Sequence, residues 1–459
     1  MTFEHPRPAG RRTRIAARRA LIVASAAVAA ALTLAGCAPG SSAVSSGTKG
    51  AVSTTLTTKK VVLKIDDETG FPLTSDLATL FTKQHPNVTF KIVRDSFQNL
   101  TANTPRLLAS SDAPDLIRQP TIGDTVKDGL LTNLDPYFTA YGWDKWPSGQ
   151  LAPLRLTKAG VRGSGSLYQL GLGYSVTGIY INQKYAKQLG ITSAPKTLAE
   201  FESDLAKAKA GGILPIQTGM QDGVGTFAYQ AIMNQYGSTT ELLNWEFNKP
   251  GARFDTPAAL KAATIFQSWA QKGYLPPDVN AINYTTMVGN FEAGQGLFMF
   301  DGNWDAAGVQ KALGTGNATF ALFPGVSSSS KFVAMGAANS FDVPAKAKNA
   351  ATAVYFLNWL HTDKAARQIV TNISGASPGG DPSEALPKVA AGSLIAQALT
   401  ASAQVGKDNG FVDFIANTTA GIYAGSLQPE EQQLLVSKIT PQQFVTAVQT
   451  YYANEIKAK

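Results

Sequence analysis

Short apolar runs alternate with amphipathic helical segments from about residue 59 to the end of this 459-residue chain. Several runs are almost continuously apolar, which is typical of strands buried on both faces. Strand–helix alternation over this length predicts an α/β fold with largely parallel sheets. The predicted strands are Val61–Ile65, Val88–Val93, Gly178–Ile181, Ile213–Ile216, Gly296–Phe300 and Phe341–Val343.

The predicted helices have clear start signals. Thr197 and Glu200 form a capping-box pattern at the start of a helix over Leu198–Ala210. Thr256-Pro257 and Thr440-Pro441 each place an N-cap residue before a proline at the first helical position. A further helix is indicated by apolar residues at helical spacing, namely Ala350, Val354, Leu357 and Leu360. A body of this length predicts two or three domains.

The N-terminus reads as an export signal. Six arginines precede the apolar run Ala20–Ala35, which ends in Leu34-Ala35-Gly36-Cys37. The run is shorter than the roughly 20 apolar residues that span a bilayer. The last four residues resemble a bacterial lipobox, in which the signal is cut before a cysteine that then carries lipid. We therefore expect residues 1–36 to be a signal peptide and Cys37, the only cysteine, to be the lipidated anchor on the outer face of the cell membrane. An ordinary signal peptide or an uncleaved anchor is the alternative.

The charge of the chain lies mostly in this segment. Residues 1–36 hold six Arg and one Glu, so they supply +5 of the chain's +8 and leave +3 for the remaining residues. No basic stripe interleaved with aromatic residues remains, and a nucleic-acid partner is not expected. Residues 37–58 follow the signal peptide and are mostly small, polar and uncharged. This composition predicts a flexible linker that carries the lipid on Cys37.

Motifs for catalysis are nearly absent. Two separated histidines, His85 and His361, remain after the signal, which argues against a zinc site. His361 is expected at a helix end, where a charged imidazole suits the helix dipole. No phosphate-binding loop, metalloprotease or nucleophile-elbow motif occurs, so neither a metal nor a cofactor is expected. Asp66-Asp67-Glu68 and the pair Asp301 and Asp305 are clustered carboxylates that could serve a glycosidase or simply cap loops.

The body of the chain resembles the extracellular solute-binding proteins, family 1, of carbohydrate ABC transporters, which are distantly similar to maltose-binding protein. The similarity runs from Val61 onward in the order and spacing of the family. The stretches that carry it are TKQHPNVTFKIV, LLASSDAPDLIRQP, DGLLTNLDPYF, GYSVTGIYINQKYAKQLGI with PKTLAEF, FEAGQGLFMFDGNWDAAG, FDVPAKAKNAATAVYFLNWL and VSKITPQQFVTAVQTYY.

This resemblance implies a two-lobed, periplasmic-binding-protein-like fold of the class II type, with the ligand in a cleft between lobes that close about a hinge. Lobe one would comprise residues 59–175 and 330–375, and lobe two residues 176–329 and 376–459. The chain would cross between lobes near Gly173–Gly178, Phe323–Ser330 and Ser374–Gly380, where Gly and Ser are frequent. The implied partners are a carbohydrate and the permease subunits of an ABC importer, and the implied protein is a monomer and not an enzyme.

The resemblance also implies ligand-binding residues at strand ends and at the hinge. Carboxylate, amide and hydroxyl groups can pair with sugar hydroxyls, and an aromatic face can cover the C–H groups of a sugar ring. The candidates carried over from the family are Asp66, Asp67, Glu68, Gln119, Thr121, Tyr174, Ser175, Gly302, Asn303, Trp304, Asn339 and Ser340. Further candidates that follow apolar segments of lobe two are Gln217, Asp222 and Asp413.

The chain departs from many relatives at two positions. Ile65 and Val224 stand where those proteins carry Trp, which favours a smaller or less apolar ligand than a long maltodextrin. Trp304 is the expected stacking residue, because it follows a strand end and precedes a helix start. We expect the other assignable tryptophans to be core or packing residues, namely Trp143, Trp146, Trp269 and Trp359. Two other functions stay open, a receptor of the same fold for a polyamine attracted by the acidic triplet, and a secreted carbohydrate-active enzyme.

Overall fold

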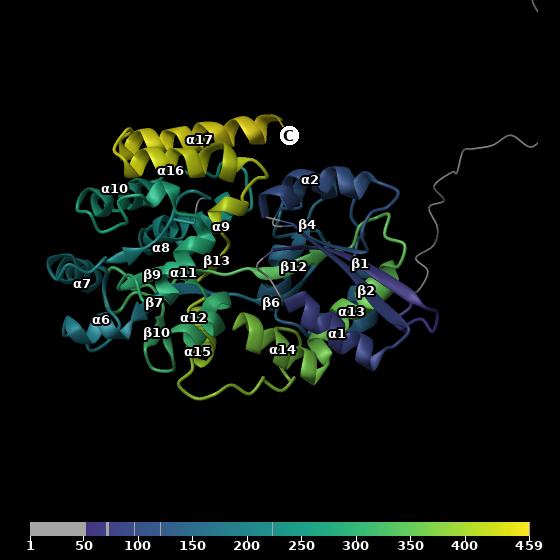
Figure 1. Cartoon of the computed structure of the whole chain (residues 1–459). Helices are drawn as coiled ribbons and strands as arrows, with labels where there is room; N and C mark the ends of the chain where they lie inside the picture. The colour runs from purple at the N-terminus through teal and green to yellow at the C-terminus, as the bar shows by residue number, and fades with distance from the viewer. Residues whose placement is uncertain (1–51, 70–72, 96, 120, 223, 459) are drawn as a thin grey trace, which may run out of the picture. The chain divides into compact units, whose positions relative to one another are not determined.

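The computed structural model describes residues 52–69, 73–95, 97–119, 121–222 and 224–458 (Figure 1). The predicted signal peptide and Cys37 therefore lie outside the described residues, as does the linker up to residue 51. Among the residues that are described, no helix has both the length and the apolar character needed to cross a bilayer.

The first sheet has five strands in the order β2-β1-β3-β12-β6. β1 pairs in parallel with β2 and β3, whereas β12 runs antiparallel to both β3 and β6. The strands are β1 (Val61–Glu68), β2 (Val88–Asp95), β3 (Leu116–Arg118), β6 (Gln169–Tyr174) and β12 (Ala338–Asp342). The associated helices are α1 (Leu73–Gln84), α2 (Phe97–Ala109), α3 (Gly123–Lys127), α4 (Asp135–Tyr141), α5 (Ser148–Leu151), α13 (Ala350–Thr362) and α14 (Lys364–Ser374).

The second sheet has four strands in the order β10-β7-β9-β8. β7 runs antiparallel to both of its neighbours, and β8 is parallel to β9. The strands are β7 (Thr177–Asn182), β8 (Ile216–Gln217), β9 (Phe298–Gly302) and β10 (Ala318–Ala321). The associated helices are α6 (Gln183–Gln188), α7 (Leu198–Ala210), α8 (Thr226–Tyr236), α9 (Thr239–Glu246), α10 (Pro257–Gln271), α11 (Tyr284–Glu292), α12 (Ala306–Leu313), α15 (Leu394–Lys407), α16 (Gln428–Leu435) and α17 (Pro441–Ala458).

Two short ribbons complete the pairing of the described strands. β4 (Arg155–Leu156) and β5 (Ser166–Leu167) form an antiparallel hairpin, and β11 (Ala334–Met335) pairs in parallel with β13 (Phe411–Val412). Four short 3₁₀ turns matter for the site and its surroundings, namely Trp143–Lys145, Ala152–Leu154, Asn303–Asp305 and Ile415–Asn417.

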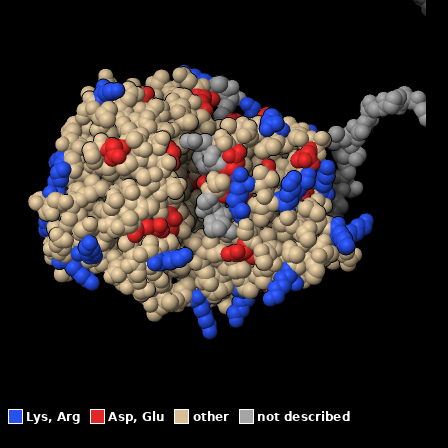
Figure 2. Space-filling model, in the orientation of Figure 1, with Lys and Arg blue, Asp and Glu red and all other residues tan. Residues whose placement is uncertain are grey.

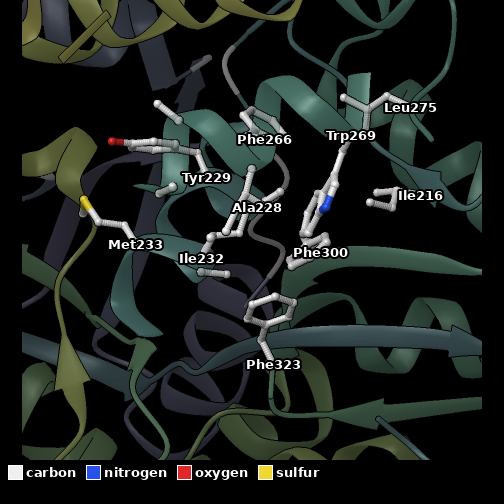
Figure 3. Close-up of a cluster of buried hydrophobic side chains, with 14 of the residues drawn as sticks. Ile216, Ala228, Tyr229, Ile232, Met233, Phe266, Trp269, Leu275, Phe300 and Phe323 are labelled. Atoms are coloured by element: carbon white, nitrogen blue, oxygen red, sulfur yellow. The ribbon is translucent and has the colours of Figure 1, made fainter. Parts of the chain in front are cut away.

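Each sheet has its own buried core. The first is built around Leu63, Ile65, Phe81 and Phe341, all at most 1% exposed. Figure 3 shows part of the second, in which side chains from α8 and α10 pack against Phe300 and Phe323. The predictions for four tryptophans are confirmed, because Trp143, Trp146, Trp269 and Trp359 are buried in these cores, and Trp245, left unassigned by the sequence, is buried as well.

The chain passes between the two sheets at residues 174–177 and 335–338. Residues 374–377 lie beside them, but the chain that follows stays bonded to α13 and α14 up to Lys388. We call these three neighbouring segments the crossing segments. Ser175 Oγ donates to the Ala337 carbonyl at 3.1 Å, and the Tyr174 N–H donates to the Ser377 carbonyl at 2.7 Å. The second crossing segment lies later than Phe323–Ser330, where the sequence placed it, because β10 still belongs to the second sheet and β12 begins only at Ala338.

The crossing segments explain why one strand in each sheet is antiparallel. β6 runs parallel to β1, so its last residue lies at the carboxyl edge of the first sheet. The chain then enters the second sheet as β7, which starts where β9 ends, with Thr177 opposite Gly302. β7 must therefore run opposite to β9. The polar residues at the carboxyl ends of both sheets are thereby brought toward the crossing segments.

The predicted helices are confirmed at Leu198–Ala210, Pro257–Gln271, Ala350–Thr362 and Pro441–Ala458. Thr197 accepts the Glu200 N–H at 3.1 Å as expected, but the Glu200 carboxylate takes the N–H of Lys196, one residue before the N-cap.

Several strand boundaries differ from the prediction. β1 extends through Glu68, so the acidic triplet lies inside the strand. β8 shrinks to Ile216–Gln217, since Pro215 has no N–H to donate to a ladder. β9 starts at Phe298, because Gly296 has a φ of +84° that extended strands do not adopt.

His361 lies in the last turn of α13, as the sequence predicted, but the expectation that it is charged there is wrong. The imidazole is 1% exposed, and its nitrogens lie 2.9 Å from the Pro378 carbonyl and 2.8 Å from the Gly171 carbonyl. Burial, together with the charge of Arg367, lowers the pKa of His361 to about 4. The residue is neutral at pH 7 and holds the residues after the third crossing segment against β6.

Candidate functional site

The acidic triplet at the end of β1 is largely occupied by neighbouring residues. Asp67 is fully buried and accepts hydrogen bonds from Thr74 Oγ1 and from the Glu68 N–H. Glu68 forms an ion pair with Arg118 at 3.3 Å. Desolvation raises the pKa of Asp66, Asp67 and Glu68. The triplet is thus not a set of free carboxylates facing solvent.

Three of the candidates, Tyr174, Ser175 and Asn303, lie in the crossing segments or bond to them. Tyr174 donates from its hydroxyl to the Gln150 carbonyl at 3.3 Å, and its ring packs over Gly379. Ser175 is bonded to Ala337. Asn303 is 1% exposed; its Oδ1 accepts the Val176 N–H at 2.8 Å, and its Nδ2 donates to the Ser374 carbonyl at 3.1 Å. The side chains of these three residues hold backbone segments together.

The other candidates in this region lie on β12. Asn339 is 7% exposed, and its Nδ2 has no hydrogen-bond partner among the described residues. Ser340 is half-buried and lies opposite Gly171, next to a register shift in the pairing of β12 with β6.

Trp304 lies at the end of β9, where the sequence predicted it. The strand ends at Gly302, residues 303–305 form a 3₁₀ turn, and α12 starts at Ala306. One face of the indole covers Gly302, since a Cβ at this position would overlap the ring. Phe227 and Phe414 contact it, with ring centroids 6.0 and 6.3 Å away. Trp304 remains half-buried, unlike the tryptophans of the core.

A hydrogen-bond network sets the orientation of this indole. Trp304 Nε1 donates to the Tyr284 hydroxyl at 2.5 Å, and that hydroxyl donates to Asp305. Asp301 is fully buried and accepts the Gly302 N–H at 2.8 Å. Desolvation, followed by the charge of Asp305, raises the pKa of Asp301 well above its usual range. Asp301 and Asp305 therefore accept hydrogen bonds from Tyr284 and Gly302, but the side chain of Asp305 does not cap α12, which begins just after it.

A cavity of about 640 Å³, open solvent included, lies between segments associated with the two sheets. Its first-sheet side contains the predicted residues Gln119 and Thr121, with Thr125 and Arg162. Its second-sheet side contains Asn248 and the run Asn417–Ala420. Figure 2 shows a hollow on one face of the molecule, with Asp and Glu side chains along its margin.

Asp413 forms an ion pair with the arginine of this cavity. Arg162 Nη2 lies 2.5 Å from Asp413 Oδ2, and Asn417 Nδ2 donates to Asp413 Oδ1 at 3.2 Å. Behind them, Glu246 accepts the Asp413 N–H at 2.8 Å. Desolvation raises the pKa of Glu246 well above its usual range, with the charge of Asp413 as the next cause. Asp413 is therefore the countercharge of Arg162.

Gln217 and Asp222 lie outside this cavity. Gln217 is 1% exposed in β8, and its side-chain amide nitrogen, Nε2, has no hydrogen-bond partner among the described residues. Asp222 Oδ2 accepts the Tyr284 N–H at 2.9 Å, which places it at the start of α11 near the Trp304 network.

The predicted residues thus lie in separate groups, namely the acidic triplet, the crossing segments, the Trp304 network and the cavity. Two of these groups are linked through the consecutive residues Asp413 and Phe414. Phe414 contacts Trp304, and its neighbour Asp413 pairs with Arg162, so the Trp304 network and the cavity adjoin. The sequence missed Arg162, Asn248 and Thr418. The available signals were the glycine-rich stretch Gly160–Gly165 and the polar run after β13, neither of which points to a ligand by itself. Within the described residues, no group of three or more His, Cys, Asp or Glu is arranged to hold a metal ion.

Residues 66–367 match the family described as "Bacterial extracellular solute-binding protein". The chain belongs to this family. Its members are extracellular binding proteins, which is the class that the resemblance in the sequence implied.

Individual relatives are more distant. A Brucella abortus (strain 2308) protein named as a binding protein is 27% identical over 246 residues, which cover 52% of this chain and 56% of that protein. A Mesorhizobium japonicum protein named "Probable sugar-binding periplasmic protein" is 25% identical over 215 residues, 46% of this chain and 49% of that protein. The chain thus spans about half the length of the curated relatives that it matches.

The fold is that of two-lobed solute-binding proteins of the maltose-binding type. A solved structure of a chitin oligosaccharide binding protein superposes with a TM-score of 0.72 at 20% identity, over 86% of this chain and 98% of that one. At this identity the likeness shows the fold and leaves the ligand to be argued from the side chains.

Proposed function

We propose that this protein captures a sugar or oligosaccharide outside the cell and delivers it to the permease subunits of an ABC importer, as a monomer held to the membrane by lipid on Cys37. The observation that carries the proposal is the cavity between the two sheets, which is lined mainly by amide and hydroxyl side chains. Such groups pair with the hydroxyls of a sugar. Trp304 does not line this cavity, but it contacts Phe414, whose neighbour Asp413 pairs with Arg162 of the lining. Family membership supports a binding role without catalysis.

Relatives of known binding type support the choice of ligand class. One distant relative is named as a sugar-binding periplasmic protein, and the superposed structure is that of a chitin oligosaccharide binding protein. We propose the lobe boundaries given by the sequence, with the second boundary moved from residue 330 to the crossing segment 335–338 and the third moved from residue 375 to Lys388.

The polyamine alternative loses its main argument. It depended on the acidic triplet as a cluster of free charges, but Glu68 pairs with Arg118, and Asp67 is buried against Thr74. At the cavity, moreover, Asp413 is already paired with Arg162, so this carboxylate is not free to attract a cation.

Ligand-dependent thermal stabilisation of the purified mature protein tests the proposal. The compounds are neutral mono- and oligosaccharides, with spermidine and amino acids as controls. A ligand that binds only the folded state at one hundred times its Kd stabilises it by about 2.7 kcal/mol. We expect a raised Tm with at least one saccharide and none with spermidine, and unchanged saccharide on chromatography. Stabilisation by spermidine alone, or release of cleaved sugar, would contradict the proposal.

A further inference from the structure

Three residues that line the same cavity each carry a buried polar atom without a partner. The atoms are Arg162 Nη1, Asn248 Oδ1 and Thr418 Oγ1, and none of them has a hydrogen-bond partner among the described residues. A buried donor or acceptor that stays unpaired is costly, so such atoms are rare in native structures. Three of them on one cavity point to a polar occupant.

The arginine is held so that its free nitrogen cannot turn away. Arg162 Nη2 pairs with Asp413 at 2.5 Å, and Nε donates to the Pro153 carbonyl at 3.3 Å. The guanidinium also lies over the ring of Phe247, 5.0 Å from its centroid. These three contacts fix the orientation of the Arg162 guanidinium and leave Nη1 as an unpaired donor.

The asparagine is fixed in a similar way. Asn248 has a φ of +55° at the end of α9, a conformation that asparagine tolerates. Its Nδ2 donates to the Thr418 carbonyl at 2.8 Å, which leaves Oδ1 as an acceptor. Asn248 and Thr418 are thereby linked to each other, while each keeps one polar atom unpaired.

The charges around these atoms indicate the charge of the occupant. Asp413 neutralises Arg162, so an anionic ligand would meet a carboxylate beside the arginine. Asp124 also lines the cavity and is itself engaged in an interaction within the protein. A cationic ligand would meet the arginine itself. The ammonium of Lys249 is directed to the Arg162 carbonyl at 2.9 Å rather than offered as a free charge. A neutral ligand suits this balance best.

We propose that Arg162, Asn248 and Thr418 form the subsite that selects the ligand, and that it takes adjacent hydroxyls of an uncharged sugar ring. One hydroxyl oxygen accepts from Arg162 Nη1, and the neighbouring hydroxyl donates to Asn248 Oδ1, with Thr418 Oγ1 able to do either. This inference rests on the proposed function and adds the residues and the charge class of the ligand.

Two threonines provide a matched pair of variants. Thr418→Val removes an unpaired hydroxyl with little change in shape. Thr256→Val, at a residue that does not line the cavity, removes the hydroxyl that accepts the Ala259 N–H at 3.2 Å at the start of α10. A recognition role predicts that Thr418→Val weakens binding about tenfold without lowering Tm. Thr256→Val should lower Tm and leave Kd within about twofold.

The measurement is titration calorimetry of the mature protein with the tightest neutral saccharide of the thermal screen, together with trigalacturonic acid and the glucosamine trimer as charged probes. Asn248→Gly, which keeps the positive φ available, should also weaken the neutral saccharide by about tenfold. Unchanged affinity in both Thr418→Val and Asn248→Gly would overturn the subsite while leaving the proposed function intact, because only ordered water would then occupy these atoms. Preference for a charged trimer would overturn the charge class. Failure of the wild-type protein to bind any saccharide would overturn both proposals.

Discussion

At the scale of single residues, the hydrogen bonds that a side chain makes within the protein distinguish structural residues from candidates for ligand binding. Asn303 and Ser175 have the chemistry of sugar-binding residues, yet their side chains are bonded to backbone groups of the crossing segments. Trp304 differs, because its N–H and one face are engaged while the residue stays half-buried. It therefore remains the best candidate for stacking on a sugar.

We expect Trp304→Ala to weaken saccharide binding by about thirtyfold, the equivalent of about 2 kcal/mol for loss of an aromatic anchor. The measurement is Kd by calorimetry with the saccharide found in the screen. Trp269→Ala is the matched control, since that indole is fully buried in the second core. It should cost about 3–5 kcal/mol of unfolding free energy and leave Kd of the folded protein unchanged. Normal binding by Trp304→Ala would make Trp304 a packing residue.

His361 gives a prediction of pH dependence. Its pKa falls to about 4 in the folded protein, because burial disfavours the charged form, whereas the unfolded chain takes up this proton below about 6.5. The unfolded state then binds more protons between these values. The contribution of neutral His361 is fully present above pH 6.5 and is lost as the pH falls toward 4, by up to about 3 kcal/mol.

His361→Gln removes this dependence. We expect the variant to be less stable than wild type at pH 7, because two carbonyl contacts change, and the difference to shrink between pH 6.5 and pH 4. Urea unfolding of both proteins across this range measures the effect. Parallel stability curves for the two proteins would mean that the imidazole is not kept neutral by the fold.

At the scale of elements, the crossing segments are joined by side chains rather than by a continuous ladder. Asn303 follows β9, yet it bonds the backbone of the first crossing segment at Val176 and of the third at Ser374. A strand of the second sheet thereby ends at the point where the chain changes sheets. A movement of one sheet relative to the other would have to stretch or break the hydrogen bonds of Asn303 to Val176 and Ser374.

Asn303→Ala should lower the free energy of unfolding by about 3 kcal/mol, since it leaves a buried N–H and a buried carbonyl without a partner. Asn303→Asp keeps the acceptor for Val176 but buries a carboxylate against the Ser374 carbonyl, so a loss at least as large as that of Asn303→Ala is expected. Equilibrium unfolding in urea checks the order of the three proteins. Equal stability of all three would show that Asn303 does not hold the crossing segments.

At the scale of the whole molecule, the fold places polar groups where the two sheets approach each other. Parallel strands bring their carboxyl ends to one edge of each sheet, and the crossing segments join those edges. The cavity is lined by residues associated with both sheets, so a ligand there contacts both. A ligand of this kind stabilises whichever arrangement of the sheets it binds better.

The anchor belongs to the same scale. Cys37 lies outside the described residues, and its lipidation remains a prediction from the sequence. Cys37→Ser should move the protein from the membrane fraction to the medium or stall its processing, because no lipid can be attached. Fractionation and the intact mass of the wild-type protein test this. An unmodified Cys37 in the mature wild-type protein would contradict the anchor.

Local patterns determined a large share of this structure. The helices that start at Leu198, Pro257 and Pro441 are predictable because a cap, a proline and an apolar stripe lie within a few residues of one another. The burial of Trp269 and Trp359 follows from the same spacing. The ordered set of family stretches was sufficient to predict the fold, and the position of Trp304 at a strand end.

The cavity and the crossing segments were decided only by the tertiary structure. Arg162, Asn248 and Thr418 are far apart in the chain and meet through packing over long sequence separations. Whether a polar atom is free for a ligand depends on every possible partner around it, as the neighbouring hydroxyls of Thr418 and Thr419 show. The sequence determines which residues carry a donor or an acceptor. Only the folded chain decides whether such an atom has a hydrogen-bond partner, because the possible partners come from distant parts of the sequence.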